Sequence, residues 1–284
     1  MEISHIEHLL YEDEEGHIIG LDEVQLLEPV PIERIPEVQK LLEESDINLV
    51  FQASLVLAAW GDKQGFNKIK DLINEKIHNK IQLASHRLYG YDNVYDLFAE
   101  AIEIYGYTQE DHKDIIEAYR KLLYLYGECA FESRFKIALL NNKYDALTNN
   151  IIDAIIRAIK NRRYYLASQL LPVLAKWEYI ETVKEFIQIF MPLPQHSPNH
   201  LANVAESLQY INDKESVSIL NQLLNHHDSS VSDQAKKSLN YLSQHNPRKV
   251  EKTTAKLTQD ESIAKPVVKW TQQTNIGRRE RQQA

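Results

Sequence analysis

The sequence has little of the material that disulfide-bonded and membrane-spanning proteins use. Cys129 is its one cysteine, so no internal disulfide can form. No stretch approaches the roughly 18 uninterrupted apolar residues of a transmembrane helix, and the acidic start lacks the basic and apolar pattern of a signal peptide. We therefore expect a cytoplasmic protein without a membrane partner.

Glycine and proline are also scarce, with 8 and 9 among 284 residues. The phosphate-cradling pattern G-x-G-x-x-G and the G-x-S-x-G turn of many hydrolases are absent. The histidines closest to zinc spacing are His5/His8, His196/His200 and His226/His227. None of these groups has further ligands in a known zinc pattern. We therefore expect no metal, no cofactor and no enzyme activity.

Charge is spread unevenly over this chain of net charge −9. Residues 1–45 carry 13 acidic and two basic side chains, whereas residues 246–284 carry nine basic and four acidic ones. An acidic body repels the phosphates of nucleic acid and attracts basic partners, its own tail included. The alternative is that the charge only keeps the chain soluble. Nucleic acid is not an expected partner.

An apolar template recurs within a helical period that runs from about residue 36 to residue 242. Full copies are anchored at Trp60, Trp177 and Ile211, a weaker copy at Tyr126, and a half copy at Leu242. Each copy predicts an apolar helix, a turn of four to five residues, and a second apolar helix. One such pair cannot bury both its faces, but stacked pairs can.

The repeat predicts an all-α protein, a right-handed α-solenoid of stacked antiparallel helix pairs over residues 31–245. An acidic, irregular lead-in is expected over residues 1–30, and a disordered basic tail over residues 246–284, where apolar residues are sparse.

Trp60-Gly61-Asp62 stands between two predicted helices and allows two interpretations. It is either an exposed binding site or a helix end, in which Gly61 adopts positive φ and Asp62 caps the next helix. Because the other anchors are apolar as well, we favour the helix end.

Two stretches resemble the HEAT-repeat family: "SLVLAAWGDKQGFNKIKDLI" and "ANVAESLQYINDKESVSILNQLLNHHDSSVSDQAKKSLNYL". The second shows the helix, the Asn-Asp turn, the second helix and the D-x-x-V start of the next unit, here Asp228 to Val231. The resemblance spans roughly residues 46–244. It departs from the family at Ser232, where an arginine is usual, and at the proline-rich break of residues 191–200.

Residues 80–113 fit the template poorly, and within them residues 85–98, "SHRLYGYDNVYDLF", are the main candidate for partner binding. Tyrosine and arginine are typical anchors of protein interfaces. The candidate residues of this stretch are His86, Arg87, Tyr89, Tyr91, Asp92 and Tyr95. A capped helix start with half-buried tyrosines is the alternative. Asp71, Glu75 and Glu185 are further candidates, since a solenoid's concave face would be lined mainly by its second helices.

A Trp-Gly-Asp turn combined with the segment H-R-x-Y-G-x-D, here His86 to Asp92, resembles immunity proteins of bacterial polymorphic toxin systems. This resemblance implies a protein that neutralises a toxin by covering its active site, and an acidic surface suits a basic toxin domain. A general assembly scaffold or chaperone, and a HEAT-like enzyme such as a chromophore lyase, are alternatives. The oligomeric state stays open.

Overall fold

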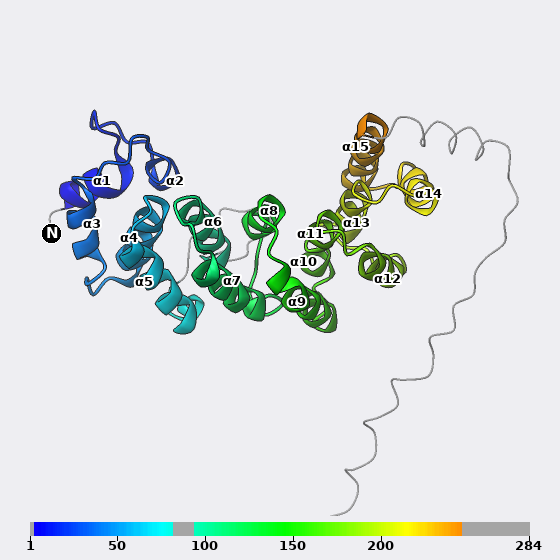
Figure 1. Ribbon diagram of the computed structural model, residues 1–284, viewed down its shortest axis with the longest axis horizontal. Coiled ribbons are helices and arrows are strands. Elements are labelled where there is room, and N and C mark those ends of the chain that lie inside the picture. Colours follow the sequence, from blue (N-terminus) through cyan, green and yellow to red (C-terminus); the bar gives the residue numbers. More distant parts are fainter. Residues whose placement is uncertain (1–2, 82–93, 246–284) are drawn as a thin grey trace, which may run out of the picture.

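The computed structural model describes residues 3–81 and 94–245, and within these ranges helices are the only regular elements besides two isolated β-bridges (Figure 1). This confirms the all-α class. The α-helices are α1 (Ile3–Tyr11), α2 (Leu21–Val24), α3 (Ile35–Leu41), α4 (Ile47–Ala59), α5 (Lys63–Asn74), α6 (Val94–Gly106), α7 (Lys113–Leu125), α8 (Arg134–Asn141), α9 (Thr148–Lys160), α10 (Tyr164–Ser168), α11 (Leu171–Lys176), α12 (Ile180–Phe190), α13 (His200–Leu208), α14 (Lys214–Leu223) and α15 (Ser229–His245). The 3-10 turns η1 (Ile77–Asn79) and η2 (Asp145–Leu147) lie between them.

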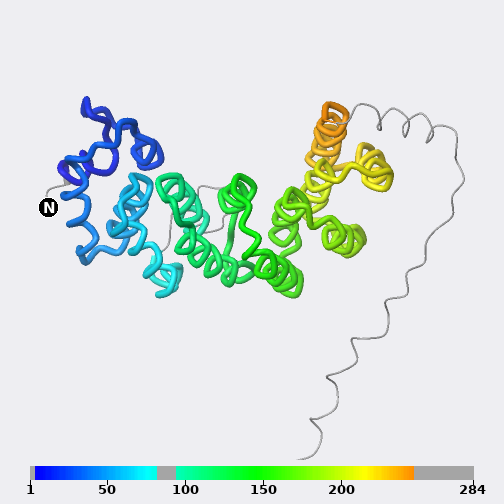
Figure 2. The backbone as a smooth tube through the Cα atoms, viewed as in Figure 1, coloured from blue at the N-terminus to red at the C-terminus, as the bar shows by residue number. Residues whose placement is uncertain are grey.

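The helices from α4 onward form two rows. In the first row, α4, α6, α8, α11, α13 and α15 each pack against the next. The second row consists of α5, α7, α9, α12 and α14; α5 packs on α4, α7 on α6, α12 on α11 and α14 on α13. The rows follow a shallow arc whose inner side is lined by the first row (Figure 1). The two ends of the arc are formed by α1–α3 and by α14–α15 (Figure 2).

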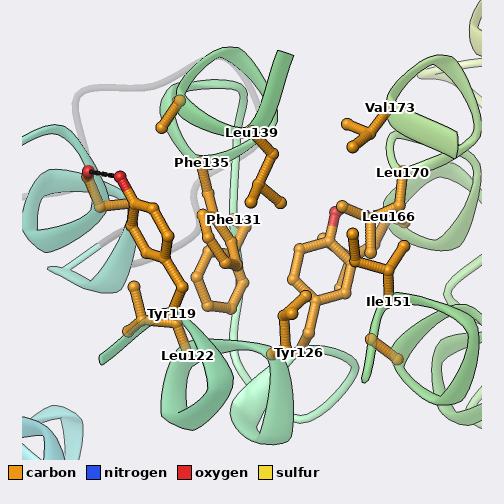
Figure 3. Close-up of a cluster of buried hydrophobic side chains, with 14 of the residues drawn as sticks. Tyr119, Leu122, Tyr126, Phe131, Phe135, Leu139, Ile151, Leu166, Leu170 and Val173 are labelled. Atoms are coloured by element: carbon orange, nitrogen blue, oxygen red, sulfur yellow. Dashed lines mark hydrogen bonds between the residues drawn. The ribbon is translucent and has the colours of Figure 1, made fainter. Parts of the chain in front are cut away.

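The main core lies between the two rows and runs from α4 to α15 without a break. Figure 3 shows its middle, where the rings of Tyr126, Phe131 and Phe135 stand beside Leu139 and Ile151. The ring centroids of Tyr126 and Phe131 lie 4.8 Å apart. Because each helix pair supplies only part of this core, neighbouring pairs stabilise one another.

The turn between α4 and α5 is a helix end, as the sequence predicts for Gly61 and Asp62. Gly61 has φ +79°, and the N–H of Asp62 donates to the carbonyl of Leu57 at 2.8 Å. The Asp62 carboxylate accepts from the N–H groups of Gln64 and Gly65 at the start of α5. Arg162 and Glu178 also take positive φ at helix ends, after α9 and α11.

Three template anchors are buried and hydrogen-bonded to neighbouring helices. The indole N–H groups of Trp60 and Trp177 both donate to a carbonyl of an earlier helix. Tyr126, the anchor of the weaker copy, donates its hydroxyl forward to the carbonyl of Leu166 instead, at 2.9 Å. The anchors therefore hold helix pairs together.

The prediction of an irregular lead-in over residues 1–30 is wrong, because α1 and α2 lie in this stretch. Ile6, Leu9 and Leu10 are spaced for one face of a helix, and the last two are buried. They belong to a second apolar cluster, formed by α1–α3 and one face of α4. Residues 3–45, which contain α1–α3 and their loops, are called the N-terminal module below.

Candidate protein-binding surface

Most of the candidate residues in the stretch that breaks the repeat cannot be placed. His86, Arg87, Tyr89, Tyr91 and Asp92 lie outside the described residues.

Tyr95 is described, and it does not lie on the surface that the sequence predicts for it. Its ring is fully buried, with Phe98 and Phe131 beside it. Its hydroxyl lies 2.6 Å from Nδ1 of His78. The reason is its place in the first turn of α6, on the face that packs into the main core. Tyr95 is therefore a core residue.

The other three candidates are exposed but do not form one surface. Asp71 and Glu75 belong to the end of α5, and Glu185 to α12. Figure 1 shows α5 and α12 far apart in the second row, on the outer side of the arc. Glu75 pairs with Lys80 at 2.6 Å, and this bond holds the pKa of the Glu75 carboxyl below its usual value. The expected concave, carboxylate-lined face is thus not built from these residues.

The N-terminal module is the most acidic surface that the structure describes. Nine of its carboxylates are exposed: Glu7, Glu14, Glu15, Asp22, Glu23, Glu28, Glu33, Glu43 and Glu44. Of its two basic residues, Arg34 is only 6% exposed, so Lys40 is the one exposed lysine or arginine between residues 3 and 45. The surface is therefore more negative than the residue count alone suggests.

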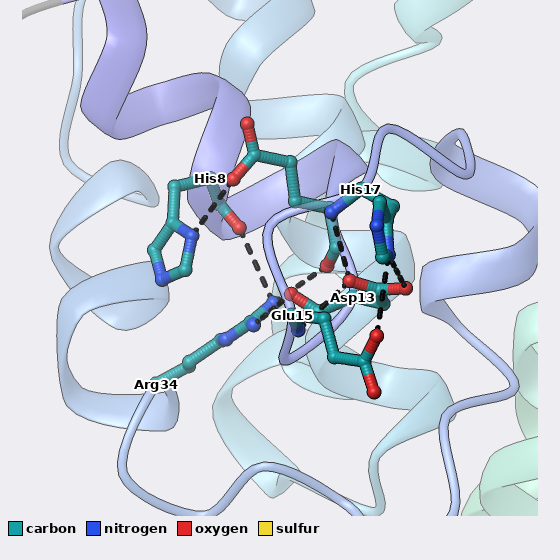
Figure 4. Close-up of polar contacts among 6 residues, drawn as sticks. His8, Asp13, Glu15, His17 and Arg34 are labelled. Carbon is teal, nitrogen blue, oxygen red and sulfur yellow. Dashed lines mark hydrogen bonds and ion pairs between the residues drawn. The ribbon is translucent and has the colours of Figure 1, made fainter.

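Arg34 is buried beneath this surface and holds its backbone in place (Figure 4). Its guanidinium donates to the carbonyls of His8, Glu12 and Asp13, at 3.2, 2.7 and 2.6 Å. These carbonyls lie at or just after the C-terminal end of α1, where helix carbonyls lack partners and the helix dipole favours a cation. Arg34 thereby fixes where the acidic loop after α1 begins.

The loop itself is closed by Asp13. Its carboxylate accepts from the N–H groups of His17 and Glu15, at 2.8 and 2.9 Å, and lies 3.1 Å from Nδ1 of His17. The hydrogen bond from the His17 backbone is the main reason why the pKa of Asp13 lies below its usual value. This closed turn holds Glu14 and Glu15 out in solvent.

Large apolar side chains stand in the same module. Ile18, Ile32 and Leu26 are 75%, 73% and 60% exposed, and no other isoleucine or leucine of the described chain exceeds 46%. Exposed apolar side chains within a charged surface are typical of protein interfaces, because apolar anchors supply affinity while the charges steer the approach. The module combines both features.

The histidines within the described ranges do not form a metal site. His8 pairs with Glu12 at 2.9 Å, and His5 lies 3.9 Å from Glu37. His200 is buried, with Nε2 3.0 Å from the carbonyl of Phe190. Burial is the main reason why the pKa of His200 lies below its usual value. Within residues 3–81 and 94–245, no group of three histidine, cysteine or acidic side chains could hold a metal ion.

The sequence shows the negative charge of residues 1–45, but none of the predicted partner-binding residues lies there. The acidic run Glu12 to Glu15 could have pointed to the loop, because residues 1–45 contain only two basic side chains, Arg34 and Lys40. The sequence does not predict that Ile18, Leu26 and Ile32 are exposed, because they lie in loops without a helical period.

Comparison with known proteins assigns neither a family nor a function to this chain. No known protein family, curated protein or solved structure matches this chain. The resemblance to HEAT repeats and to immunity proteins therefore stays a prediction. None of the helices in the described ranges is long and apolar enough to cross a bilayer.

Proposed function

We propose that the protein is a non-catalytic module that binds a basic protein partner through its N-terminal module. In the most specific form of this proposal the partner is a bacterial toxin domain, and the protein is the cytoplasmic immunity protein that neutralises it. The scaffold would be a HEAT-like α-solenoid. The two rows of helices, the recurring turn and the buried tryptophan anchors support such an arrangement.

The observation that carries the proposal is the composition of one surface. Nine exposed carboxylates, one exposed lysine and three exposed apolar side chains belong to the same 43 residues. A field of one sign raises the rate of encounter with a basic protein, and the apolar side chains then supply contact area.

Native affinity purification from the host, followed by mass spectrometry, tests this function. Glu14→Lys/Glu33→Lys reverses two exposed carboxylates of the N-terminal module that form no hydrogen bond or ion pair with another described residue. Asp71→Lys/Glu185→Lys is the matched control on the second row. We expect wild type and the control to retain one basic protein in equal amount, and the module variant to lose it.

Other outcomes discriminate between the hypotheses. Loss with the Asp71/Glu185 variant alone would favour the surface predicted from the second helices. Several unrelated proteins at low stoichiometry would favour a general scaffold or chaperone, and recovery of nucleic acid alone would contradict the proposal. For a toxin partner, cells that express it should survive only when the wild-type protein is co-expressed.

A further inference from the structure

Two carboxylates are buried in the part of the chain that the structure describes, and both belong to α6. The first, Asp96, is 1% exposed. It accepts from the backbone N–H groups of Ser133, Arg134 and Phe135, at 3.2, 3.1 and 2.9 Å. These groups lie at the start of α8, where free N–H groups and the helix dipole stabilise an anion. Asp96 is therefore a structural residue.

The second buried carboxylate, Glu103, has no comparable set of backbone N–H donors. It is 9% exposed, and its Oε1 accepts from the hydroxyl of Tyr107 at 2.7 Å and from Nδ2 of Asn141 at 2.8 Å. Throughout the described ranges, no donor reaches Oε2, and no lysine, arginine or histidine pairs with this carboxylate. Burial of a carboxylate anion is unfavourable when only two neutral groups donate to it and both donate to the same oxygen.

Elsewhere in the described chain, partly buried carboxylates do have cations. Glu206 pairs with Lys136 at 2.9 Å, and Asp213 with Lys184 at 2.6 Å. The absence of a cation at Glu103 is thus a property of this position rather than of the whole molecule. It leaves one carboxylate oxygen available to a positively charged ligand.

Tyr107, Tyr119 and Tyr144 are the tyrosines on which this carboxylate acts. The rings of Tyr119 and Tyr144 meet edge to face with centroids 5.9 Å apart, and His112 meets Tyr144 at 5.8 Å. Burial raises the pKa of Tyr107 to about 12, and the Glu103 carboxylate adds to the rise; the same two causes act on Tyr119 and Tyr144. Tyr107 is 66% exposed, so the group reaches the molecular surface.

We propose that Glu103 is the binding site for an organic cation, an ammonium or guanidinium group that binds at Oε2 close to Tyr107. Both groups donate to a carboxylate and are attracted to the faces of aromatic rings. A divalent metal fits poorly, because it requires several oxygen ligands. The cation can come from a lysine or arginine of a protein partner or from a free diamine, and the inference goes beyond the proposed function.

Nuclear magnetic resonance of the full chain with ¹³C-labelled tyrosine tests this site. The probes are the blocked amides of lysine and arginine, putrescine, the blocked amide of norleucine as a neutral control, and MgCl2. We expect saturable shifts of the Tyr107 and Tyr144 ring signals with the organic cations and none with norleucine. Response to the blocked amino acids indicates a partner side chain, and response to putrescine alone indicates a free diamine.

Glu103→Gln keeps the side-chain shape and removes the charge, and we expect at least tenfold weaker binding of the responding cation. The matched control is Glu117→Gln on α7, which should bind within twofold of wild type. Tyr107→Phe keeps the ring, removes one of the two donors to Oε1 and should bind at least as tightly as wild type, so it tests the site if Glu103→Gln does not fold.

Three results would overturn the site: unchanged binding by Glu103→Gln, equal shifts with the norleucine probe, or tighter binding of Mg²⁺ than of the organic cations. No partner protein enters these titrations. A negative result in these titrations therefore does not contradict the proposed function. Failure to recover a basic partner likewise does not contradict the cation site at Glu103.

Discussion

The indole N–H of Trp60 donates to the carbonyl of Val24 at 2.9 Å. Val24 is the last residue of α2, and Trp60 directly follows α4. The bond therefore joins the N-terminal module to the first row at a helix end, where carbonyls lack partners within their own helix. Trp177 makes the same type of bond to Leu139 of α8 at 3.0 Å. The two tryptophans show that the same type of contact occurs near the start of the arc and again in its middle.

Trp60→Phe and Trp177→Phe should each lower the free energy of unfolding by about 2 kcal/mol. Both changes remove the indole donor of a helix-end carbonyl and part of a packed ring. Urea titration of the full chain measures the loss, and Tyr124→Phe, at a ring that is 65% exposed, is the control. A loss below about 0.5 kcal/mol in both variants, within the usual effect of a surface substitution, would show that the bonds are not needed.

Arg34→Met should destabilise the N-terminal module by about 2 kcal/mol or more, because three carbonyls lose a charged donor while an apolar chain of similar length remains. Hydrogen exchange should speed up from α1 to α3 and stay unchanged from α11 to α15. Lys40→Met, at the exposed lysine of the same module, is the matched control and should change little. Uniformly faster exchange along the chain would contradict a local role of Arg34.

Asp96→Asn should lower the free energy of unfolding by about 1–3 kcal/mol, because a neutral amide is a weaker acceptor for the three N–H groups of α8. Thermal or urea unfolding measures the change. Asp153→Asn, at an exposed aspartate of α9, should alter stability by less than about 0.5 kcal/mol. Equal losses in the two variants would mean that Asp96 is not a helix cap.

Tyr107 should titrate near pH 12, because burial and the Glu103 carboxylate raise its pKa. A phenol whose pKa is higher in the folded chain than in the unfolded chain, where it is about 10, stabilises the fold fully below pH 10. That contribution is lost as the pH rises from 10 to 12. In Glu103→Gln the Tyr107 pKa should move back toward 10, as followed by its ¹³C ring signal. An unchanged pKa would show that Glu103 does not act on Tyr107.

The sequence predicts the helical class and several helix ends because these depend on neighbouring residues. Gly61 and Asp62 adopt the positive φ and the capping role expected of them. Asp213 likewise caps α14 by accepting from the N–H of Ser216. Such features need only the local order of apolar, glycine and capping residues.

The candidate surface could not be predicted to the same extent because burial depends on distant contacts. Tyr95 looks like an interface residue in a tyrosine-rich stretch, yet its ring is buried beside His78 and Phe131, which both lie outside α6. Glu103 and Asn141 are 38 residues apart, so nothing in the local sequence pairs them. The two basic residues of the N-terminal module read alike in the sequence, and only the fold shows that Arg34 is buried and Lys40 exposed.

Hydrogen exchange of the protein alone and in complex with the purified basic partner tests the central claim most directly. Binding through the N-terminal module predicts the strongest protection in the loop between Glu12 and Ile19 and between Leu26 and Arg34, where the exposed carboxylates and apolar side chains lie. Protection confined to α5 and α12, or a complex in which the module exchanges as fast as in the free protein, would contradict the account.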